Sequence, residues 1–175
     1  YRSIVERNRE HHEAIDALER LVEVESVQQD VIDVLDPLYR DRDDNVKLAD
    51  LYRLRVERAE ESGEKVALLT ELAQLQENQL LDSEAALQTV GQAFKLEPTD
   101  TMLLEELKRL TEALGAWPTF VESLEWVLSE VELDTVQARE LGLLAARTYD
   151  ERLGDVERAE ERYRAVLVLE PENAE

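Results

Sequence analysis

The final stretch of the chain, RLGDVERAEERYRAVLVLEPENAE (residues 152–175), decides the fold. Gly154-Asp155 predicts a turn, because both residue types favour turn conformations. The run behind it is rich in helix-forming residues and ends at Pro171, since proline cannot continue a helix. Ala174-Glu175 then begins something new. We expect these two residues to open a sixth unit of a repeating array, cut here from a longer one.

An earlier copy of this stretch supports the repeat. LLDSEAALQTVGQAFKLEPTD (residues 80–100) aligns with residues 153–173 after a shift of 73 positions, the separation of Leu80 from Leu153. Asp82 then meets Asp155, Ala86 meets Ala159, and the tripeptide Leu-Glu-Pro recurs. Half of this shift, about 36 residues, is a period typical of helical repeats, so a further copy is expected between the two.

That copy is GAWPTFVESLEWVL (residues 115–128). Gly115 predicts the turn, and Pro118 suits the first turn of a helix. Phe120, Leu124 and Val127 follow at steps of four and three, which places them on one helix face.

Two weaker copies precede these three. In the second copy along the chain, the middle one of the three apolar positions holds Arg53, and Tyr52 stands beside it. One small or apolar anchor marks each of the five copies, at spacings of 35, 37, 34 and 39 residues: Ala14, Ala49, Ala86, Phe120 and Ala159. Each copy holds two helical stretches joined by a short turn, which divides one domain over residues 1–175 into units at about 1–26, 27–63, 64–100, 101–134 and 135–173.

The last copy resembles the tetratricopeptide repeat (TPR) family. Its aromatic, turn, small and proline positions are filled by Tyr149, Gly154-Asp155, Ala159, Tyr163, Val166 and Pro171, with one extra residue before the turn. Other copies depart from the motif at Gln76, Leu81, Phe120, Glu132, Ser26 and Glu61. Another helical-pair solenoid of similar period is the alternative. The resemblance implies an all-α fold, a right-handed α-solenoid of about five antiparallel helix pairs.

In that family the first helices of the pairs line a concave groove that commonly holds a peptide or a partner helix. The resemblance places nine residues in this groove: Thr70, Gln74, Glu77, Glu105, Arg109, Glu112, Leu143, Arg147 and Asp150. The Lys and Asn clamp by which the chaperone-tail binders of the family hold a terminal carboxylate is missing at these places. The mixed charges of these positions instead fit a protein partner that bears both charges, or no groove ligand at all.

Composition excludes several classes of partner. The formal net charge is −22, which disfavours nucleic acid and anionic membrane surfaces. The sequence has no cysteine, signal peptide or apolar run long enough to span a bilayer. We expect a cytoplasmic protein without direct membrane insertion, and the composition fits a bacterial source.

Candidate catalytic or metal-binding residues do not form a set. His11 and His12 are adjacent, so they point about 100° apart on a helix and are expected to be turn or first-turn residues. The carboxylate pairs carry little information among 42 acidic residues. We expect no catalytic residues, no metal and no cofactor. Trp117 and Trp126 are both expected in the core, and an exposed tryptophan would be a contact anchor.

Two functions follow. The first is a non-catalytic scaffold that presents a helical-repeat groove to a protein or peptide. The second is a structural spacer or self-associating rod without a groove ligand. In the second, uncapped terminal repeats leave an apolar face that pairs with another copy. An enzyme is not expected in this segment.

Overall fold

The structure is a computed structural model that describes residue 3 and residues 11–22 and 24–169, without the side chain of Glu25. All regular elements in these ranges are helical and none is a strand, which confirms the all-α class for this part of the chain. In chain order they are α2 (His12–Leu21), η1 (Glu25–Val27), α3 (Gln28–Asp41), α4 (Asn45–Arg58), α5 (Ser62–Asn78), α6 (Ser83–Leu96), α7 (Thr101–Leu114), α8 (Trp117–Glu130), α9 (Thr135–Arg147), η2 (Thr148–Leu153) and α10 (Val156–Leu169).

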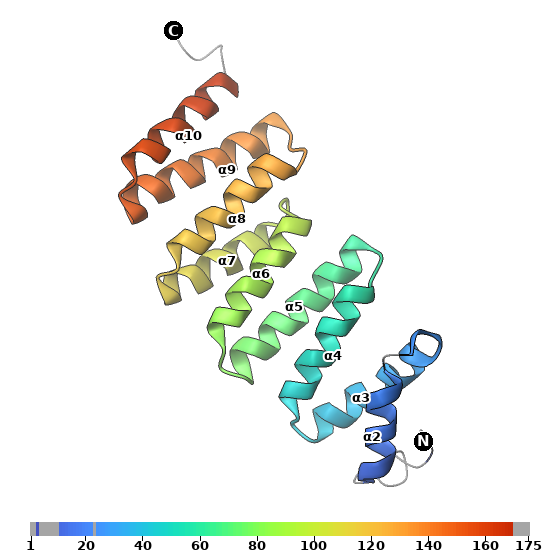
Figure 1. Cartoon of the computed structure of the whole chain (residues 1–175). Coiled ribbons are helices and arrows are strands. Elements are labelled where there is room, and N and C mark those ends of the chain that lie inside the picture. The colour runs from blue at the N-terminus through green and yellow to red at the C-terminus, as the bar shows by residue number, and fades with distance from the viewer. Residues whose placement is uncertain (1–2, 4–10, 23, 170–175) are drawn as a thin grey trace.

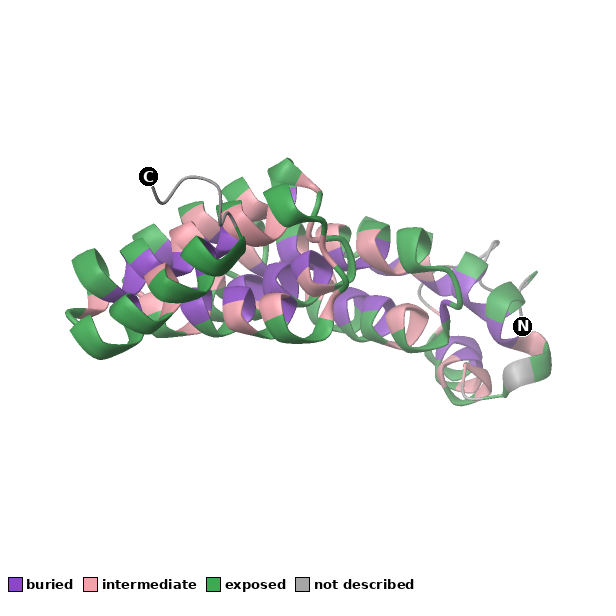
Figure 2. Cartoon of the chain, turned by 90° about the horizontal axis from the view of Figure 1, so that it is seen from above, coloured by how far each residue is buried: buried purple, intermediate pink, exposed green. Residues whose placement is uncertain are grey.

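The helices follow one another in a row from α2 to α10 (Figure 1). Each helix packs against the next one in the chain, and α8 also packs against α6. Seen from above, the described part is elongated, with the buried residues between exposed outer faces (Figure 2). The buried apolar side chains form two clusters that meet on α5, where Leu68 belongs to one cluster and Leu69 to the other. No pair of helices could bury its apolar faces alone, so neighbours share them.

The turns inside the four described helix pairs share one backbone conformation. Asp43, Leu81, Gly115 and Gly154 stand there with φ of 54°, 54°, 66° and 66°. This left-handed conformation ends a helix, and glycine adopts it without steric strain. The next residue then begins the second helix. At Asp44, Asp82 and Asp155 the carboxylate caps that helix by accepting a backbone N–H three residues on. The turns predicted at Gly115 and Gly154-Asp155 are confirmed, and Pro118 lies in the first turn of α8.

The extra residue expected before the last turn is absorbed by η2, a π-helical segment. A π-helix closes a wider turn than an α-helix, with hydrogen bonds from residue i to i+5, and therefore accommodates one additional residue within the helix. It ends at Gly154, whose neighbour Asp155 donates its N–H to the carbonyl of Tyr149 at 2.9 Å. Tyr149 therefore stays buried, as its place in the repeat requires.

All five anchor residues are buried, but the register of the second copy is corrected by one residue. Ala86, Phe120 and Ala159 each lie four residues after the cap of their helix, whereas the residue four after Asp44 is Leu48. Counted from the capping residue, the middle apolar position of this helix is therefore Tyr52 and not Arg53. Arg53 is exposed and Tyr52 is buried, so the slot is filled by an apolar ring.

Two side-chain predictions have opposite outcomes. His11 caps α2 by accepting the N–H of Ala14 at Nδ1, and His12 opens the helix, as expected. Trp117 packs half-buried against the core, edge-on to Phe120 with ring centroids 6.0 Å apart. The prediction that Trp126 also lies in the core is wrong, because it is 41 % exposed. Val127 takes the inward direction on α8, and the Trp126 ring, turned about 100° away, lies under the ammonium of Lys95.

Pro171 and Ala174-Glu175, which the sequence interprets as a helix stop and the start of a sixth unit, lie outside the described residues.

Candidate partner-binding face

The first helices of three successive pairs, α5, α7 and α9, enclose two hollows. The larger, of about 460 Å³, lies between α7 and α9 and is lined by Pro98, Thr99, Thr101, Leu104, Gln137, Glu140, Leu141, Leu143, Leu144 and Arg147. The smaller, of about 330 Å³, lies between α5 and α7 with a wall from α6, and is lined by Thr70, Ala73, Gln74, Val90, Ala93, Asp100, Met102, Leu103 and Glu106. Helix α7 therefore separates the two.

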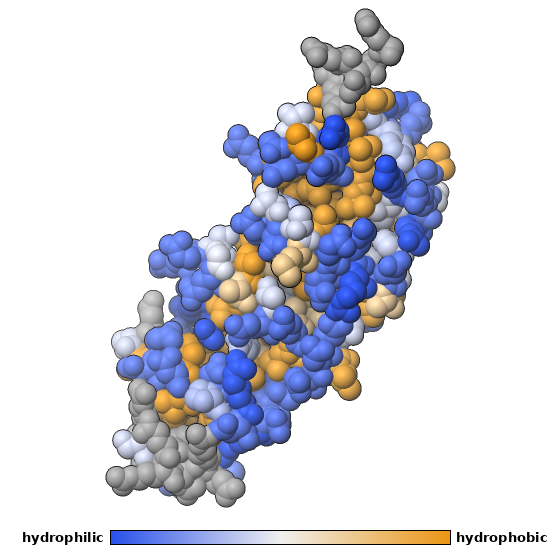
Figure 3. Space-filling view, turned by 180° about the vertical axis from the view of Figure 1, so that it is seen from behind, coloured by the Kyte–Doolittle hydropathy of each residue, from blue (hydrophilic) through white to orange (hydrophobic). Residues whose placement is uncertain are grey.

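Figure 3 shows the molecule from behind, where polar and apolar side chains alternate over the surface. Apolar side chains gather most densely in the upper part of this view, toward the C-terminal end of the described chain.

Four of the nine predicted groove residues line these hollows. Thr70 and Gln74 face the smaller hollow, and Leu143 and Arg147 face the larger. Within each pair the residues are four apart, which puts them on one face of their helix. The predicted spacing thus brings these residues to hollows between first helices.

Three other predicted residues form ion pairs that tie the first helices together. Arg109 Nη2 lies 2.6 Å from Glu77 Oε2 on α5 and 2.7 Å from Glu106 Oε1 on its own helix. Glu112 lies 3.5 Å from Arg152 of η2. These side chains are satisfied within the chain, so their first role is to hold α5, α7 and η2 in place.

The two remaining predicted residues line neither hollow. Glu105 is exposed on α7, where its carboxylate lies 3.9 Å from Lys108 of the same helix. Asp150 is exposed on η2. For Asp150, the π-helical turn changes the register that a regular helix would give, and sequence spacing alone could not account for that shift.

The two arginines of this face have different electrostatic surroundings. Hydrogen bonds to Glu106 and Glu77 raise the pKa of Arg109, and the bond to Arg109 lowers the pKa of Glu106 below its ordinary value of 4.5. Arg147, in contrast, is exposed at the larger hollow and forms no ion pair with any residue that the structure describes. The cation that this face offers to a partner is therefore Arg147.

Apart from Leu143, sequence reasoning missed the apolar lining of the larger hollow. Leu104, Leu141 and Leu144 supply it, and Pro98 closes one side from the loop before α7. The run Leu141-Gly-Leu-Leu144 has more leucines than one buried face of α9 requires. This excess is the feature of the sequence from which an apolar lining could have been predicted.

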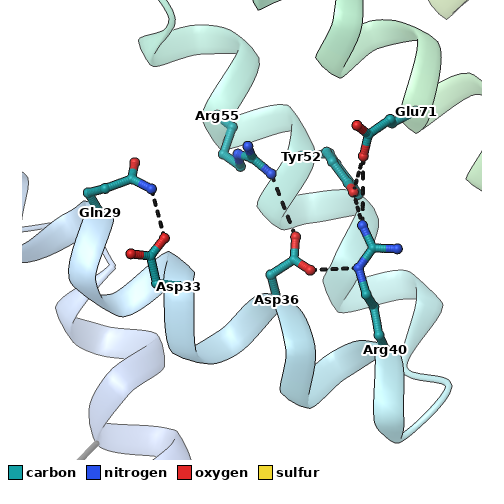
Figure 4. A network of polar contacts seen from close by, with 7 residues as sticks. All are labelled: Gln29, Asp33, Asp36, Arg40, Tyr52, Arg55 and Glu71. Carbon is teal, nitrogen blue, oxygen red and sulfur yellow. Dashed lines mark hydrogen bonds and ion pairs between the residues drawn. The ribbon is translucent and has the colours of Figure 1, made fainter.

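A polar network joins α3, α4 and α5 (Figure 4). Arg40 lies between Asp36 at 2.6 Å and Glu71 at 3.7 Å, and it donates to the hydroxyl of Tyr52. Tyr52 in turn donates to Glu71 at 2.5 Å, and Arg55 reaches Asp36 at 3.6 Å. Burial and the bond to Glu71 raise the pKa of Tyr52 well above its ordinary value of 10.0. Asp36 and Glu71 each have a cationic or phenolic partner, so the network is explained as a connection between helices.

The residues that the structure describes hold no group of three or more His, Asp or Glu side chains placed to bind a metal ion. In the same ranges, none of the helices combines the length and apolar character needed to cross a bilayer.

The chain was compared with known proteins. No family model and no curated protein matches it. Among solved structures it is similar to BtubC (BKLC) from P. vanneervenii, at 16 % identity and a TM-score of 0.42, over 94 % of this chain and 72 % of that one.

Proposed function

We propose that this chain is a non-catalytic scaffold with a TPR-like, right-handed superhelical arrangement of helix pairs, whose first-helix face holds a segment of a partner protein. One observation carries the proposal: two hollows adjoin on the face formed by α5, α7 and α9, and the larger combines an apolar lining with an exposed arginine. The repeated turn conformation and the shared anchor positions support the TPR-like arrangement.

The larger hollow is the expected anchor point. Its lining of Leu104, Leu141 and Leu144 can take an apolar side chain of the partner, and burying one such side chain contributes about 1.5–3 kcal/mol. Arg147 and Glu140 at the same hollow select a partner segment that carries an acidic and a basic group near the apolar one. The smaller hollow adds apolar contacts from Val90, Met102 and Leu103 further along the segment. Its two carboxylates already have partners within the chain, because Asp100 caps α7 and Glu106 pairs with Arg109.

The test places a photo-reactive side chain at position 143, next to Arg147, and irradiates the chain in an extract of its source cells. We expect a discrete cross-linked protein whose yield falls about tenfold when Arg147→Glu is added, since a charged contact contributes 1.5–3 kcal/mol. Arg20→Glu is the matched control, because Arg20 is exposed on the distant helix α2 and the substitution changes the charge equally.

Arg109→Glu is unsuitable as the test variant. It would place a third carboxylate beside Glu77 and Glu106 and weaken the fold itself. A cross-linked product that is equally abundant with Arg147→Glu, or the absence of any product, contradicts the groove proposal.

The alternative, a structural spacer or self-associating rod without a groove ligand, is favoured by the exposed apolar side chains of Val156, Leu167 and Val168 on α10.

A further inference from the structure

The larger hollow on the first-helix face presents its groups in a fixed order along α9. Four of its lining residues follow one another on one face of that helix: Glu140, Leu141, Leu144 and Arg147. An acidic and a basic group thus stand on either side of two leucines, seven residues or about 10.5 Å apart along the helix axis. Both walls of the hollow belong to helices inside the row, because α7 packs on α6 and α8, and α9 packs on α8 and α10.

The two charges of this face are open to a partner. Glu140 and Arg147 are exposed, and neither forms an ion pair with a residue that the structure describes. On the neighbouring helix α7, in contrast, Arg109 and Glu106 satisfy each other. A partner that places a cation beside Glu140 and a carboxylate beside Arg147 therefore gains two complementary contacts without breaking one inside the chain.

A helix fits this spacing better than an extended segment does. Side chains at i, i+3, i+4 and i+7 share one face of a helix, so the outer two stand about 10.5 Å apart with two side chains between them. On one face of an extended segment, side chains recur about every 6.6 Å, which leaves one side chain between charges about 13 Å apart. The helix therefore brings two apolar side chains, instead of one, to the three leucines of the hollow, Leu104, Leu141 and Leu144.

The hollow also offers little to the backbone of an extended segment. Of the residues that the structure places in its lining, Gln137 alone carries an amide side chain, and its Oε1 accepts the N–H of Asp134 at 3.4 Å in the cap of α9. The hydroxyl of Thr99 donates to Glu97. An extended segment laid on the leucines would leave backbone N–H and C=O groups without partners, whereas a helix pairs most of its own.

The direction of the bound helix follows from its dipole. A short helix is stabilised when an acidic residue lies toward its N-terminus and a basic residue toward its C-terminus. The acidic residue must face Arg147 and the basic residue must face Glu140, which reverses their order along α9. We infer that the hollow binds an amphipathic helix of a partner protein, antiparallel to α9, with an acidic residue at i, apolar residues at i+3 and i+4, and a basic residue at i+7. This inference rests on the proposed function and names the form and direction of the bound segment.

Binding of a synthetic helix is the first test. The probe is a fluorescently labelled, alanine-based peptide of about 16 residues, long enough for a helix, with Glu at i, Leu at i+3 and i+4, and Lys at i+7. The whole 175-residue chain should bind it, as measured by fluorescence anisotropy. Arg147→Glu should weaken this binding about tenfold, because it replaces an attractive contact by a repulsive one. A second peptide with proline at i+5 cannot form the helix and should not bind.

The direction of the bound helix is the second test, and introduced cysteines report it specifically because the sequence has no cysteine. Val136 and Glu151 are exposed and stand four residues outside the two charges, one on each side. A peptide with cysteine at its N-terminus should form a disulfide with Glu151→Cys and not with Val136→Cys. The charge swap Glu140→Arg/Arg147→Glu should reverse this pattern.

The control swap Glu13→Arg/Arg20→Glu has the same spacing and net charge on the distant helix α2, and should leave both results unchanged. A proline peptide that binds as well as the helical one overturns the inference. So does a helical peptide that does not bind, or a disulfide pattern that the swap on α9 does not reverse. If the photo-cross-linked partner is still obtained in these cases, the proposed function stands and only the form and direction of the segment are wrong. Failure of both experiments removes the proposed function as well.

Discussion

The helix pair α5/α6 and the helix pair α7/α8 build the same unit with different residues. Four residues after the cap of the second helix, one has Ala86 and the other Phe120, and both are fully buried. The turn holds Leu81 in one pair and Gly115 in the other, at φ of 54° and 66°. The two pairs therefore share one backbone arrangement, and each pair fills it with different side chains.

Buried polar groups differ in the same two pairs. In α5/α6, the Thr89 hydroxyl donates to Oε1 of Gln76 at 2.7 Å, and both side chains are buried. In α7/α8, Thr111 is buried and its Oγ1 has no hydrogen-bond partner among the described residues. The first pair therefore contains a satisfied polar contact, while the second contains an unsatisfied hydroxyl.

The largest expected effect concerns the anchor position. Phe120→Ala gives α7/α8 the residue that α5/α6 has, but without the packing that surrounds Ala86, so it leaves a cavity between α6, α8 and Trp117. We expect the free energy of unfolding to fall by about 3–5 kcal/mol, measured by urea denaturation. Met102→Ala, on an exposed side chain of the same pair, is the control and should change it by less than about 0.5 kcal/mol. A small loss for Phe120→Ala would mean that the two pairs repack freely.

The sequence predicted the repeated features because they come from strong local chemistry. Gly154 and Asp155 specify their turn, and the stripe of Phe120, Leu124 and Val127 specifies its buried face. Leu81 departs from the motif at the position of the turn glycine, and a leucine in a sequence does not predict a left-handed conformation. Of the predicted groove residues, Arg147 lines a hollow, whereas Glu105 and Asp150 line neither. Asp150 lies in the π-helical insertion, which is set by tertiary packing and which sequence spacing does not reveal.

The next largest effect concerns the two buried hydroxyls, at which the same substitution of threonine by valine is expected to have opposite results. Thr89→Val leaves the Gln76 carbonyl buried without its donor, so the free energy of unfolding should fall by about 1–3 kcal/mol. Thr111→Val removes a hydroxyl that lacks a partner, so it should raise the same quantity by about 1 kcal/mol. Both changes in the free energy of unfolding are measured by urea denaturation, as a shift of the midpoint with the slope of the free energy against urea concentration unchanged. Changes of the same sign would contradict the contrast between the two pairs.

A smaller effect is expected at the turns. Gly115→Ala forces a side chain into the left-handed region and should lower the free energy of unfolding by about 1 kcal/mol. Leu81→Gly relieves that strain at a residue that is 82 % exposed, and should raise it by about 0.5–1 kcal/mol. Leu81→Ala is the matched control: it removes the exposed side chain but keeps the strain, so thermal unfolding should be nearly unchanged. Equal gains from Ala and Gly at position 81 would assign the effect to the exposed leucine instead of the backbone.

The smallest effect concerns how each pair is attached to the helices before it. α5 is attached to α4 through the Tyr52–Glu71 hydrogen bond, whereas α7 is attached to α5 through Arg109, whose charge does not change in the accessible pH range. Because the pKa of Tyr52 is raised in the folded chain above its ordinary value of 10.0, its contribution to stability is complete well below pH 10. The contribution is lost progressively as the pH approaches and passes that value, because the tyrosine of the unfolded chain ionises first. Between pH 9 and 10 the free energy of unfolding should fall by roughly 0.4 kcal/mol through this tyrosine. Tyr52→Phe should remove that part of the pH dependence, while phenolate absorbance below pH 10 should be the same in both chains, since Tyr52 does not ionise there. An early phenolate signal that disappears with Tyr52→Phe would show that the hydroxyl is freely titrating, and that α5 is held to α4 by packing alone.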